Sequence, residues 1–267
     1  MDMKSKSDIK IIFTDIDCTI LNHIGGHFFD MKSIKALKKA QKRGVLLYLC
    51  TARPYDSIYQ TGLFDILSPD GIVCTNGAVV LDKNLNVIYH HTFPKEYAKQ
   101  IIDTAIKHNI CAEVCTATER YITKEIDDYV RGYLAIYYEM LPEVRKPSYE
   151  DISGILVFAP KEYDEIFRNE FPKDIELLRF TDYGVDIKCE RIEKSEGVIK
   201  ALEYLNISKD NAMAIGDDYG DIPMFEAVKY SVCMSNGKDE AKEAATHITK
   251  HINKHGVKHI LKKLKVI

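Results

Sequence analysis

Two aspartates, spaced two residues apart, directly follow a mostly apolar run near the start of the chain. The run covers residues 9–14 and leads into Asp15 and Asp17. A run of this kind is typical of a buried strand in a parallel sheet, and such strands deliver catalytic groups at their carboxyl ends. Two carboxylates this close repel each other, so they are costly unless a cation or a catalytic task uses them. The pattern predicts metal or acid–base chemistry at the edge of an open α/β sheet.

Polar side chains follow three further predicted strands in the same way. Because the ends of parallel strands point in one direction, we expect these groups to converge with the first aspartates. Carboxylates suit Mg²⁺, while a threonine hydroxyl and a lysine ammonium suit the oxygens of a phosphate. Together they are the groups that phosphoryl transfer needs. The residues are Thr51, Asn76, Asp217, Asp218 and Asp221, with Lys194 before a predicted helix.

The elements that must position these groups alternate between strand and helix at both ends of the chain. This order predicts a doubly wound parallel sheet, an α/β fold of the Rossmann-like kind. Between the two ends the rhythm changes to short strands and amphipathic helices, which predicts an inserted α+β domain. We therefore expect a discontinuous core domain, 1–81 and 189–267, with an insertion at 82–188. Predicted core strands are 9–14, 45–50, 212–215 and 230–234, with a further strand and its turn over 71–78, and predicted helices are 31–43, 57–67, 195–205 and 238–245. A small hairpin with its turn at Gly25 and Gly26 is expected beside the site.

Composition excludes several classes of protein. The chain has 267 residues, of which 46% are apolar and 29% charged, as in ordinary globular proteins. Its net charge of −3 gives no field that favours nucleic acid or an anionic membrane. Seven cysteines are scattered without a CxxC pair, which favours reduced thiols over zinc or disulfides. Segment 1–7 lacks the apolar core of a signal peptide, and no run approaches the roughly 18 apolar residues of a membrane helix. We expect a cytoplasmic protein.

These groups resemble, in order, the four motifs of the haloacid dehalogenase (HAD) superfamily. A lone first motif is a weak signal, whereas four motifs in order are a strong one. The insertion after the second motif is similar to the type-two (IIB) cap of the Cof-type sugar-phosphate phosphatases, and segments 75–78, 235–237 and 246–257 also fit that subfamily. The motifs are Asp15-x-Asp17-x-Thr19, Thr51, Lys194 and Gly216-Asp217-Asp218-x-x-Asp221.

The resemblance implies a role for each matched residue. Asp15 is the expected nucleophile, which forms an aspartyl-phosphate, and Asp17 the acid that protonates the leaving alcohol and then activates water. Mg²⁺ is expected on the carboxylates of Asp15 and Asp217 and on the backbone carbonyl of Asp17, with Asp221 binding it directly or through a neighbour.

The expected phosphate site and its supports complete the assignment. Thr51 and Lys194 are expected to hold the transferring group, helped by backbone amides around Ile16 and Ala52. Candidates for support or substrate contact are Arg53, Asn76, Asp218 and Asn236. Of these, the two asparagines are better interpreted as turn and loop-bracing residues, and Arg53 either orients its loop or meets the substrate.

The sequence departs from the family pattern twice. Cys18 replaces a common glycine after the second aspartate, where only backbone conformation is at stake. Gly220 replaces an asparagine before the last aspartate that normally contacts phosphate, which predicts a weaker phosphate site.

Purely structural interpretations exist for several of these residues. Lys194 lies between Glu193 and Glu196 and could form an exposed ion pair that contributes little to stability. Thr51 and Asp221 could cap a turn or a helix, and for Asp221 both roles can coexist. Four histidines recur every four residues, but Gly256 interrupts them, so we do not expect a metal there: His247, His251, His255 and His259.

The function expected is a Mg²⁺-dependent hydrolase of small phosphomonoesters, sugar phosphates first, working as a monomer or homodimer. One alternative is a phosphosugar mutase on the same fold, which returns the phosphoryl group to its substrate. Another is a non-hydrolytic sensor of phosphorylated metabolites, or a phospho-acceptor module. The insertion and the acidic loop 216–221 argue against the acceptor module.

Overall fold

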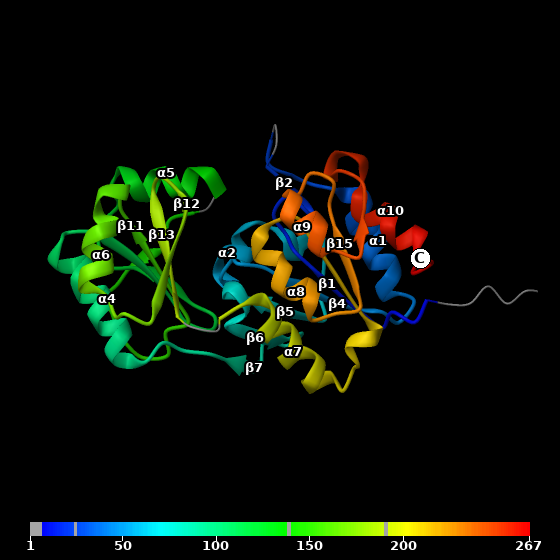
Figure 1. Cartoon of the computed structure of the whole chain (residues 1–267), viewed down its shortest axis with the longest axis horizontal. Helices are drawn as coiled ribbons and strands as arrows, with labels where there is room; N and C mark the ends of the chain where they lie inside the picture. The colour runs from blue at the N-terminus through cyan, green and yellow to red at the C-terminus, as the bar shows by residue number, and fades with distance from the viewer. Residues whose placement is uncertain (1–6, 24–25, 138–139, 190–191) are drawn as a thin grey trace, which may run out of the picture. The chain divides into compact units, whose positions relative to one another are not determined.

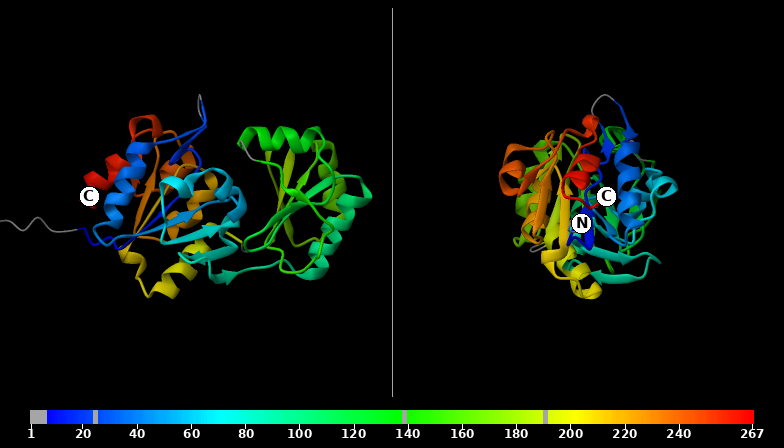
Figure 2. Two further views of the ribbon diagram at one scale, coloured as in Figure 1. Left: turned by 180° about the vertical axis from the view of Figure 1, so that it is seen from behind. Right: turned by 90° about the vertical axis from the view of Figure 1, so that its right-hand side faces the viewer.

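The computed structural model describes residues 7–23, 26–137, 140–189 and 192–267. The N-terminal segment 1–6 and Gly25 of the expected hairpin turn lie outside these ranges. The chain forms two compact units, shown in Figures 1 and 2. The first comprises residues 1–52, 64–89 and 193–267, and the second 53–63 and 90–192.

An eight-stranded sheet organises the first unit, with β1 (Ile11–Thr14) at its centre. On one side lie β4 (Leu46–Cys50), β5 (Gly71–Cys74), β6 (Val79–Asp82) and β7 (Val87–His90), and on the other β14 (Ala212–Gly216), β15 (Tyr230–Cys233) and β16 (His247–Ile248). All pairs from β16 to β5 are parallel, and β6 runs antiparallel to β5. Thr14 lies opposite both Leu49 and Ile215, so β1, β4 and β14 end at the same edge.

Helices cover this sheet on both faces, as a doubly wound fold requires. The helices α7 (Lys194–Leu205), α8 (Ile222–Glu226) and α9 (Asp239–Ala244) share a core with Phe13 and Tyr48. The helices α1 (Met31–Gln41) and α10 (Gly256–Lys263) contact each other, and α1 contacts β4 (Figure 1). Because strand side chains alternate, Leu47 and Leu49 face the opposite side from Tyr48. The predicted fold class of the core is confirmed.

The predicted helix 57–67 is instead two helices, α2 (Tyr55–Gln60) and α3 (Leu63–Ile66). Gly62 adopts φ +74 between them, a conformation that ends a helix. Thr61 reinforces the break, because its hydroxyl donates to the Ile58 carbonyl at 2.6 Å and accepts from the Leu63 amide at 3.2 Å. Helix α2 belongs to the second unit, although it follows a core strand in the sequence.

The second unit is built on a six-stranded sheet. Its strand order is β10 (Glu143–Val144), β9 (Arg120–Ile122), β8 (Cys111–Cys115), β11 (Gly154–Phe158), β13 (Gly184–Cys189) and β12 (Ile175–Thr181). All pairs are antiparallel except β9–β10. The helices α4 (Lys95–Lys107) and α6 (Asp164–Glu170) bury one face around Val157 and Phe167, and α5 (Asp128–Tyr137) packs on the other around Leu156 and Phe158. The inserted α+β domain is thus present.

The chain passes from the first unit to the second within β7. The expected insertion, 82–188, starts at the last residue of β6, whereas β7 still belongs to the first sheet and the units change at Tyr89. Further short elements are β2 (Leu21–Asn22) and β3 (Phe28–Phe29), which pair at the expected hairpin. Within the described ranges, no helix combines the length and the apolar character needed to cross a membrane.

Candidate active site

The turn after β1 fixes the first aspartate at the sheet edge. The Asp15 amide donates to the Ile215 carbonyl on β14, which extends the sheet by one bond. The Ile16 carbonyl then accepts from three amides, those of Thr19, Ile20 and Leu21, so the chain turns tightly around it. Cys18 takes φ +55 in this turn, the left-handed region that favours glycine. This backbone requirement explains why a glycine is common at that position of the family motif.

Lys194 lies at the centre of the site rather than on the surface. Its ammonium Nζ is 2.8 Å from Asp15 Oδ1 and 2.6 Å from Asp221 Oδ1. The three side chains are less than 10% exposed. An exposed pair of Lys194 with Glu193 or Glu196 is therefore the wrong interpretation.

Two glycines set the position of Lys194. Gly77, at φ +97, lies so close to the start of α7 that a Cβ there would be 2.1 Å from the Glu193 carbonyl oxygen. A Cβ on Gly197 would be 3.0 Å from the Cα of Gly77. The turn after β5 thus packs directly against the first turn of α7, and this close approach places Lys194 beside Asp15.

The acidic loop after β14 is organised by Asp221. Its Oδ2 accepts from the amides of Asp217, at 2.7 Å, and Asp218, at 3.0 Å. A Cβ on Gly216 would lie 2.3 Å from that oxygen, so only glycine lets the carboxylate turn back on its own loop. Asp218 caps the following turn through the Tyr219 amide, at 2.7 Å. Asp221 is a capping residue and a site residue at once.

Three carboxylates of this site could hold a metal ion. Asp15, Asp217 and Asp221 each offer an oxygen, and these oxygens lie within 4.8 Å of one another. Both oxygens of Asp221 already accept from Lys194 or from backbone amides. Asp15 and Asp217 each use one oxygen, toward Lys194 and Thr19, and the other accepts no hydrogen bond from the described residues. The donor set fits a hard cation such as Mg²⁺, and Asp15 and Asp217 each have an oxygen available to bind it.

The electrostatics of the cluster also fit a cation. Burial raises the pKa of Asp15 to about 8 in spite of Lys194, with Asp221 and Asp17 adding to the rise. Burial also raises the pKa of Asp217 to about 9, helped by the charges of Asp15 and Asp221. Burial opposes the charge of Lys194, but Asp15 and Asp221 outweigh it and raise the lysine pKa. A bound cation favours the ionised carboxylates that this protein alone disfavours.

The expected phosphate-binding segment ends β4. Thr51 is 1% exposed, and its amide donates to the Val73 carbonyl at 3.0 Å. Its carbonyl accepts from the Asn76 amide at 3.3 Å, and Asn76 takes φ +55 in the turn after β5. Ala52 follows Thr51 and is exposed. Asn76 therefore braces the backbone of Thr51 from the neighbouring strand.

Asn236 braces the first motif. Its Nδ2 donates to the Cys18 carbonyl at 2.9 Å, and its Oδ1 accepts from the Ile252 amide at 2.9 Å. Arg53, in contrast, belongs to the second unit, and its described contacts lie there. It donates to Ser57 Oγ at 2.9 Å, and its guanidinium lies 5.6 Å from the centre of the Tyr137 ring. The structure thus gathers the carboxylates, Lys194 and Thr51 in one unit and Arg53 in the other.

Sequence reasoning assigned no role to three further residues of this region. Thr19 Oγ1 donates to Asp217 Oδ1 at 3.1 Å and so holds one oxygen of that carboxylate. His23 Nε2 lies 2.5 Å from Asp17 Oδ1. Thr75 adopts φ +49, rare for a branched side chain, and its buried hydroxyl has no partner among the described residues. Thr19 and Thr75 lie in segments that carry the family resemblance, whereas no spacing rule connects His23 to the site.

The four spaced histidines do not share a helix. His247 is on β16, His251 precedes a short turn, His255 immediately precedes α10, and His259 lies within α10. His255 Nδ1 lies 2.8 Å from Asp30 Oδ1, which also caps α1.

Comparison with known proteins decides the family. A family model described as haloacid dehalogenase-like hydrolase matches residues 12–261. The chain belongs to this family. The predicted membership is confirmed, and with it the prediction that the protein is a hydrolase. The shared region spans both units, so the second unit is the family's cap.

Two relatives of this HAD chain come from Bacillus subtilis (strain 168). Phosphatase YwpJ is 24% identical over 272 residues, which cover 88% of this chain and 92% of the relative. The 5-amino-6-(5-phospho-D-ribitylamino)uracil phosphatase YcsE is 24% identical over 239 residues, 88% of each chain.

Solved structures give the same fold. A hypothetical protein from Geobacillus kaustophilus HTA426 superposes with a TM-score of 0.86 at 27% identity, over 97% of this chain and all of that one. The HAD subclass IIB sugar phosphatase BT4131 superposes with a TM-score of 0.78 at 21% identity, over 97% and 100%. The second likeness shows the fold alone.

Proposed function

We propose that this HAD hydrolase is a Mg²⁺-dependent phosphatase that hydrolyses small phosphomonoesters, sugar phosphates among them, through an aspartyl-phosphate on Asp15. The observation that carries the proposal is the buried contact of Lys194 with Asp15 and Asp221, with Asp217 beside them. The names of the relatives support it, since YwpJ and YcsE are called phosphatases and BT4131 a sugar phosphatase.

The metal site of the proposal uses the carboxylates of Asp15 and Asp217 and the backbone carbonyl of Asp17, with Asp221 holding the loop. When bound, Mg²⁺ neutralises charge on the transferring phosphoryl group and orients it. Lys194 supplies a second positive charge to the same group, and Thr51 a hydroxyl.

The protein's own residues carry two steps. In the first, a carboxylate oxygen of Asp15 bonds to phosphorus while the bond to the leaving oxygen breaks, and Asp17 gives its proton to that oxygen. In the second, Asp17 takes a proton from water, whose oxygen attacks phosphorus and releases inorganic phosphate from Asp15. The two steps return both aspartates to their starting states. His23, 2.5 Å from Asp17, holds that carboxyl in place.

Further parts of the proposal concern the setting of the enzyme. None of the seven cysteines, all of which lie in the described ranges, forms a disulfide, which supports an enzyme of the reducing cytoplasm. The proposed substrate is a small phosphorylated metabolite, and the cap unit is the proposed source of selectivity for its alcohol. A monomer or a homodimer is proposed for the active form.

The experiment that tests this function is phosphate release from p-nitrophenyl phosphate and a panel of sugar phosphates, with and without Mg²⁺. The wild-type protein should release phosphate only with Mg²⁺, and Asp15→Asn should release none. Asp210→Asn, an exposed change on a distant turn, is the matched control and should match the wild type. Transfer of the phosphoryl group to a second sugar hydroxyl instead of water would identify a mutase. Binding of sugar phosphates without any release would identify a sensor.

A further inference from the structure

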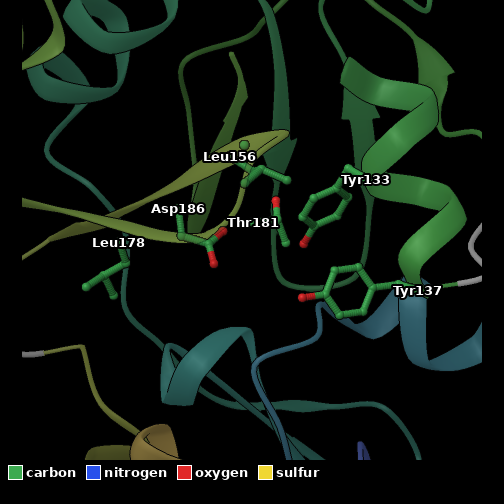
Figure 3. Close-up of a pocket in the computed structure, with 7 residues that line it drawn as sticks. Tyr133, Tyr137, Leu156, Leu178, Thr181 and Asp186 are labelled. Atoms are coloured by element: carbon green, nitrogen blue, oxygen red, sulfur yellow. The ribbon is translucent and has the colours of Figure 1, made fainter. Parts of the chain in front are cut away.

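The cap unit contains a pocket that is built from elements of that unit alone. It is lined from α5, β11, β12 and β13, and the space of about 200 Å³ between its walls includes open solvent. Figure 3 shows two phenol groups on α5 directed toward the strands that carry Asp186 and Thr181. The lining includes Tyr133, Tyr137, Leu156, Leu178, Thr181 and Asp186.

Asp186 occupies an unusual position for a carboxylate. In the register of the sheet it lies between Leu156 on β11 and Leu178 on β12, so both of its cross-strand neighbours are apolar. Burial raises the pKa of Asp186 to about 7, and no neighbouring charge contributes. Among the described residues, none donates a hydrogen bond to this carboxylate or pairs with it. Asp186 is only partly exposed, so its carboxylate lines the pocket with little water and without a cation from the described residues.

The same cross-strand row of the sheet contains a second carboxylate, which is buried and paired with an arginine. Glu113 on β8 lies opposite Leu156, two strands from Asp186, and is 4% exposed. Arg120 faces it, with Nη1 3.3 Å from Glu113 Oε2. Arg120 also donates to Asp56, at 3.2 Å, and to Gln60, at 3.1 Å. The structural carboxylate thus has a built-in cation, whereas Asp186 has a pocket in its place.

The aromatic side of the pocket favours a cation as the occupant. Tyr133 and Tyr137 lie one turn apart on α5, with ring centres 4.9 Å apart. The guanidinium of Arg53 lies 5.6 Å from the centre of the Tyr137 ring, so this pair already attracts a positive group. A hydroxyl would donate to Asp186 but leave its charge uncompensated, while an ammonium provides both the donor and the charge.

We propose that this pocket binds an ammonium group, and that the phosphomonoester hydrolysed by the enzyme carries one. The first half stands on the pocket alone. The second half rests on the proposed function, in which the cap selects the leaving alcohol. Amino-sugar phosphates and amino-alcohol phosphates share the required chemistry.

Binding without phosphate tests the first half. Glucosamine and glucose, which differ at one amino group, are titrated into the full-length protein in an amine-free buffer. Binding is followed through the NMR resonances of the tyrosines. Glucosamine should bind at least about tenfold more tightly than glucose, and Asp186→Asn should remove that difference. Asp182→Asn, an exposed change in the β12–β13 turn, is the control and should keep it.

A second variant guards against a folding artefact. Tyr137→Leu keeps an apolar side chain but removes the ring, and it should weaken glucosamine binding severalfold without changing the weak binding of glucose. Equal binding of the two sugars by the wild type overturns the proposal, as does an equal loss in Asp186→Asn and Asp182→Asn.

Turnover tests the second half separately. The ratio of kcat/KM for glucosamine 6-phosphate over glucose 6-phosphate should exceed about ten in the wild type and fall toward one in Asp186→Asn. Hydrolysis with a ratio near one in both proteins overturns the ammonium assignment and leaves the phosphatase standing. Absence of hydrolysis for every phosphomonoester overturns the phosphatase, and the glucosamine titration then still decides the pocket.

Discussion

Replacing Lys194 by methionine removes the only positive charge that the described residues place between Asp15 and Asp221. Methionine keeps the length of the apolar stem, so the change is chiefly one of charge. Two contacts of 2.8 and 2.6 Å are lost in a place where all three side chains are less than 10% exposed. Removing one partner of a buried ion pair costs about 3–5 kcal/mol, because the remaining charge stays buried without compensation. We expect a loss of that size in the free energy of unfolding without Mg²⁺.

Metal separates the two roles of Lys194. Added Mg²⁺ supplies positive charge to the same carboxylates and should recover a large part of the lost stability. The kcat should remain about 10²–10³-fold below that of the wild type, because the charged contact to the transferring phosphoryl group is still missing.

The assays are urea unfolding followed by circular dichroism, with and without Mg²⁺, and phosphate release at saturating substrate. Lys200→Met on the same helix is the control, since its pairs with Glu203 and Glu196 are partly exposed, and it should change stability by less than about 0.5 kcal/mol. A loss below about 1 kcal/mol for Lys194→Met without metal, or turnover near the wild-type rate, would refute this reasoning.

Four further changes probe the surroundings of the site and the pocket. Gly77→Ala should destabilise the fold by about 3 kcal/mol or more in denaturant titration and lower kcat, because its Cβ would strike the Glu193 carbonyl; a near-neutral result would contradict the close approach. Gly220→Asn should fold normally, since no atom lies within 4 Å of an added Cβ, and should lower the inhibition constant of inorganic phosphate severalfold; an unchanged constant would show that this loop does not reach phosphate. His23→Ala should lower kcat about tenfold with KM unchanged in steady-state kinetics, and full activity would deny His23 a role in holding Asp17. Asp186→Asn should be more stable than the wild type only above about pH 4. The pKa of Asp186 is about 7 in the folded protein and 3.8 in the unfolded chain, so the wild type loses stability as the pH rises from about 4 to 7. The loss is at most about 4 kcal/mol, because the group is partly exposed. Equal stability of the two proteins at pH 8 in urea titration would contradict that shift.

The core of the fold could be predicted because its signals are local. Apolar strands such as 11–14 and 212–216 are followed directly by acidic residues, and the helical spacing of apolar residues such as Ile34 and Leu37 defines a helix before any packing is known. The one helix predicted wrongly, 57–67, broke at Gly62, where helix propensity gave way to a positive φ that the sequence pattern did not mark.

The parts of the site that escaped prediction depend on contacts between distant segments. Nothing in the spacing of Gly77 and Gly197 shows that their backbones touch and so position Lys194. His23 reaches Asp17 because the chain turns tightly around the Ile16 carbonyl and brings Leu21 back beside Asp17. Asp186 looks like any polar residue of an alternating strand until the register shows a leucine on each side. Such features need the tertiary fold.

The most direct test of the central claim is covalent labelling of Asp15 during turnover. The protein is mixed with a phosphomonoester carrying a radiolabelled phosphoryl group, quenched in acid within the first turnover, digested and sequenced. We expect Mg²⁺-dependent label on the peptide that contains Asp15, and none in Asp15→Asn. Phosphate release by the wild type with no labelled Asp15 peptide, or by Asp15→Asn at a comparable rate, would contradict an aspartyl-phosphate at this residue.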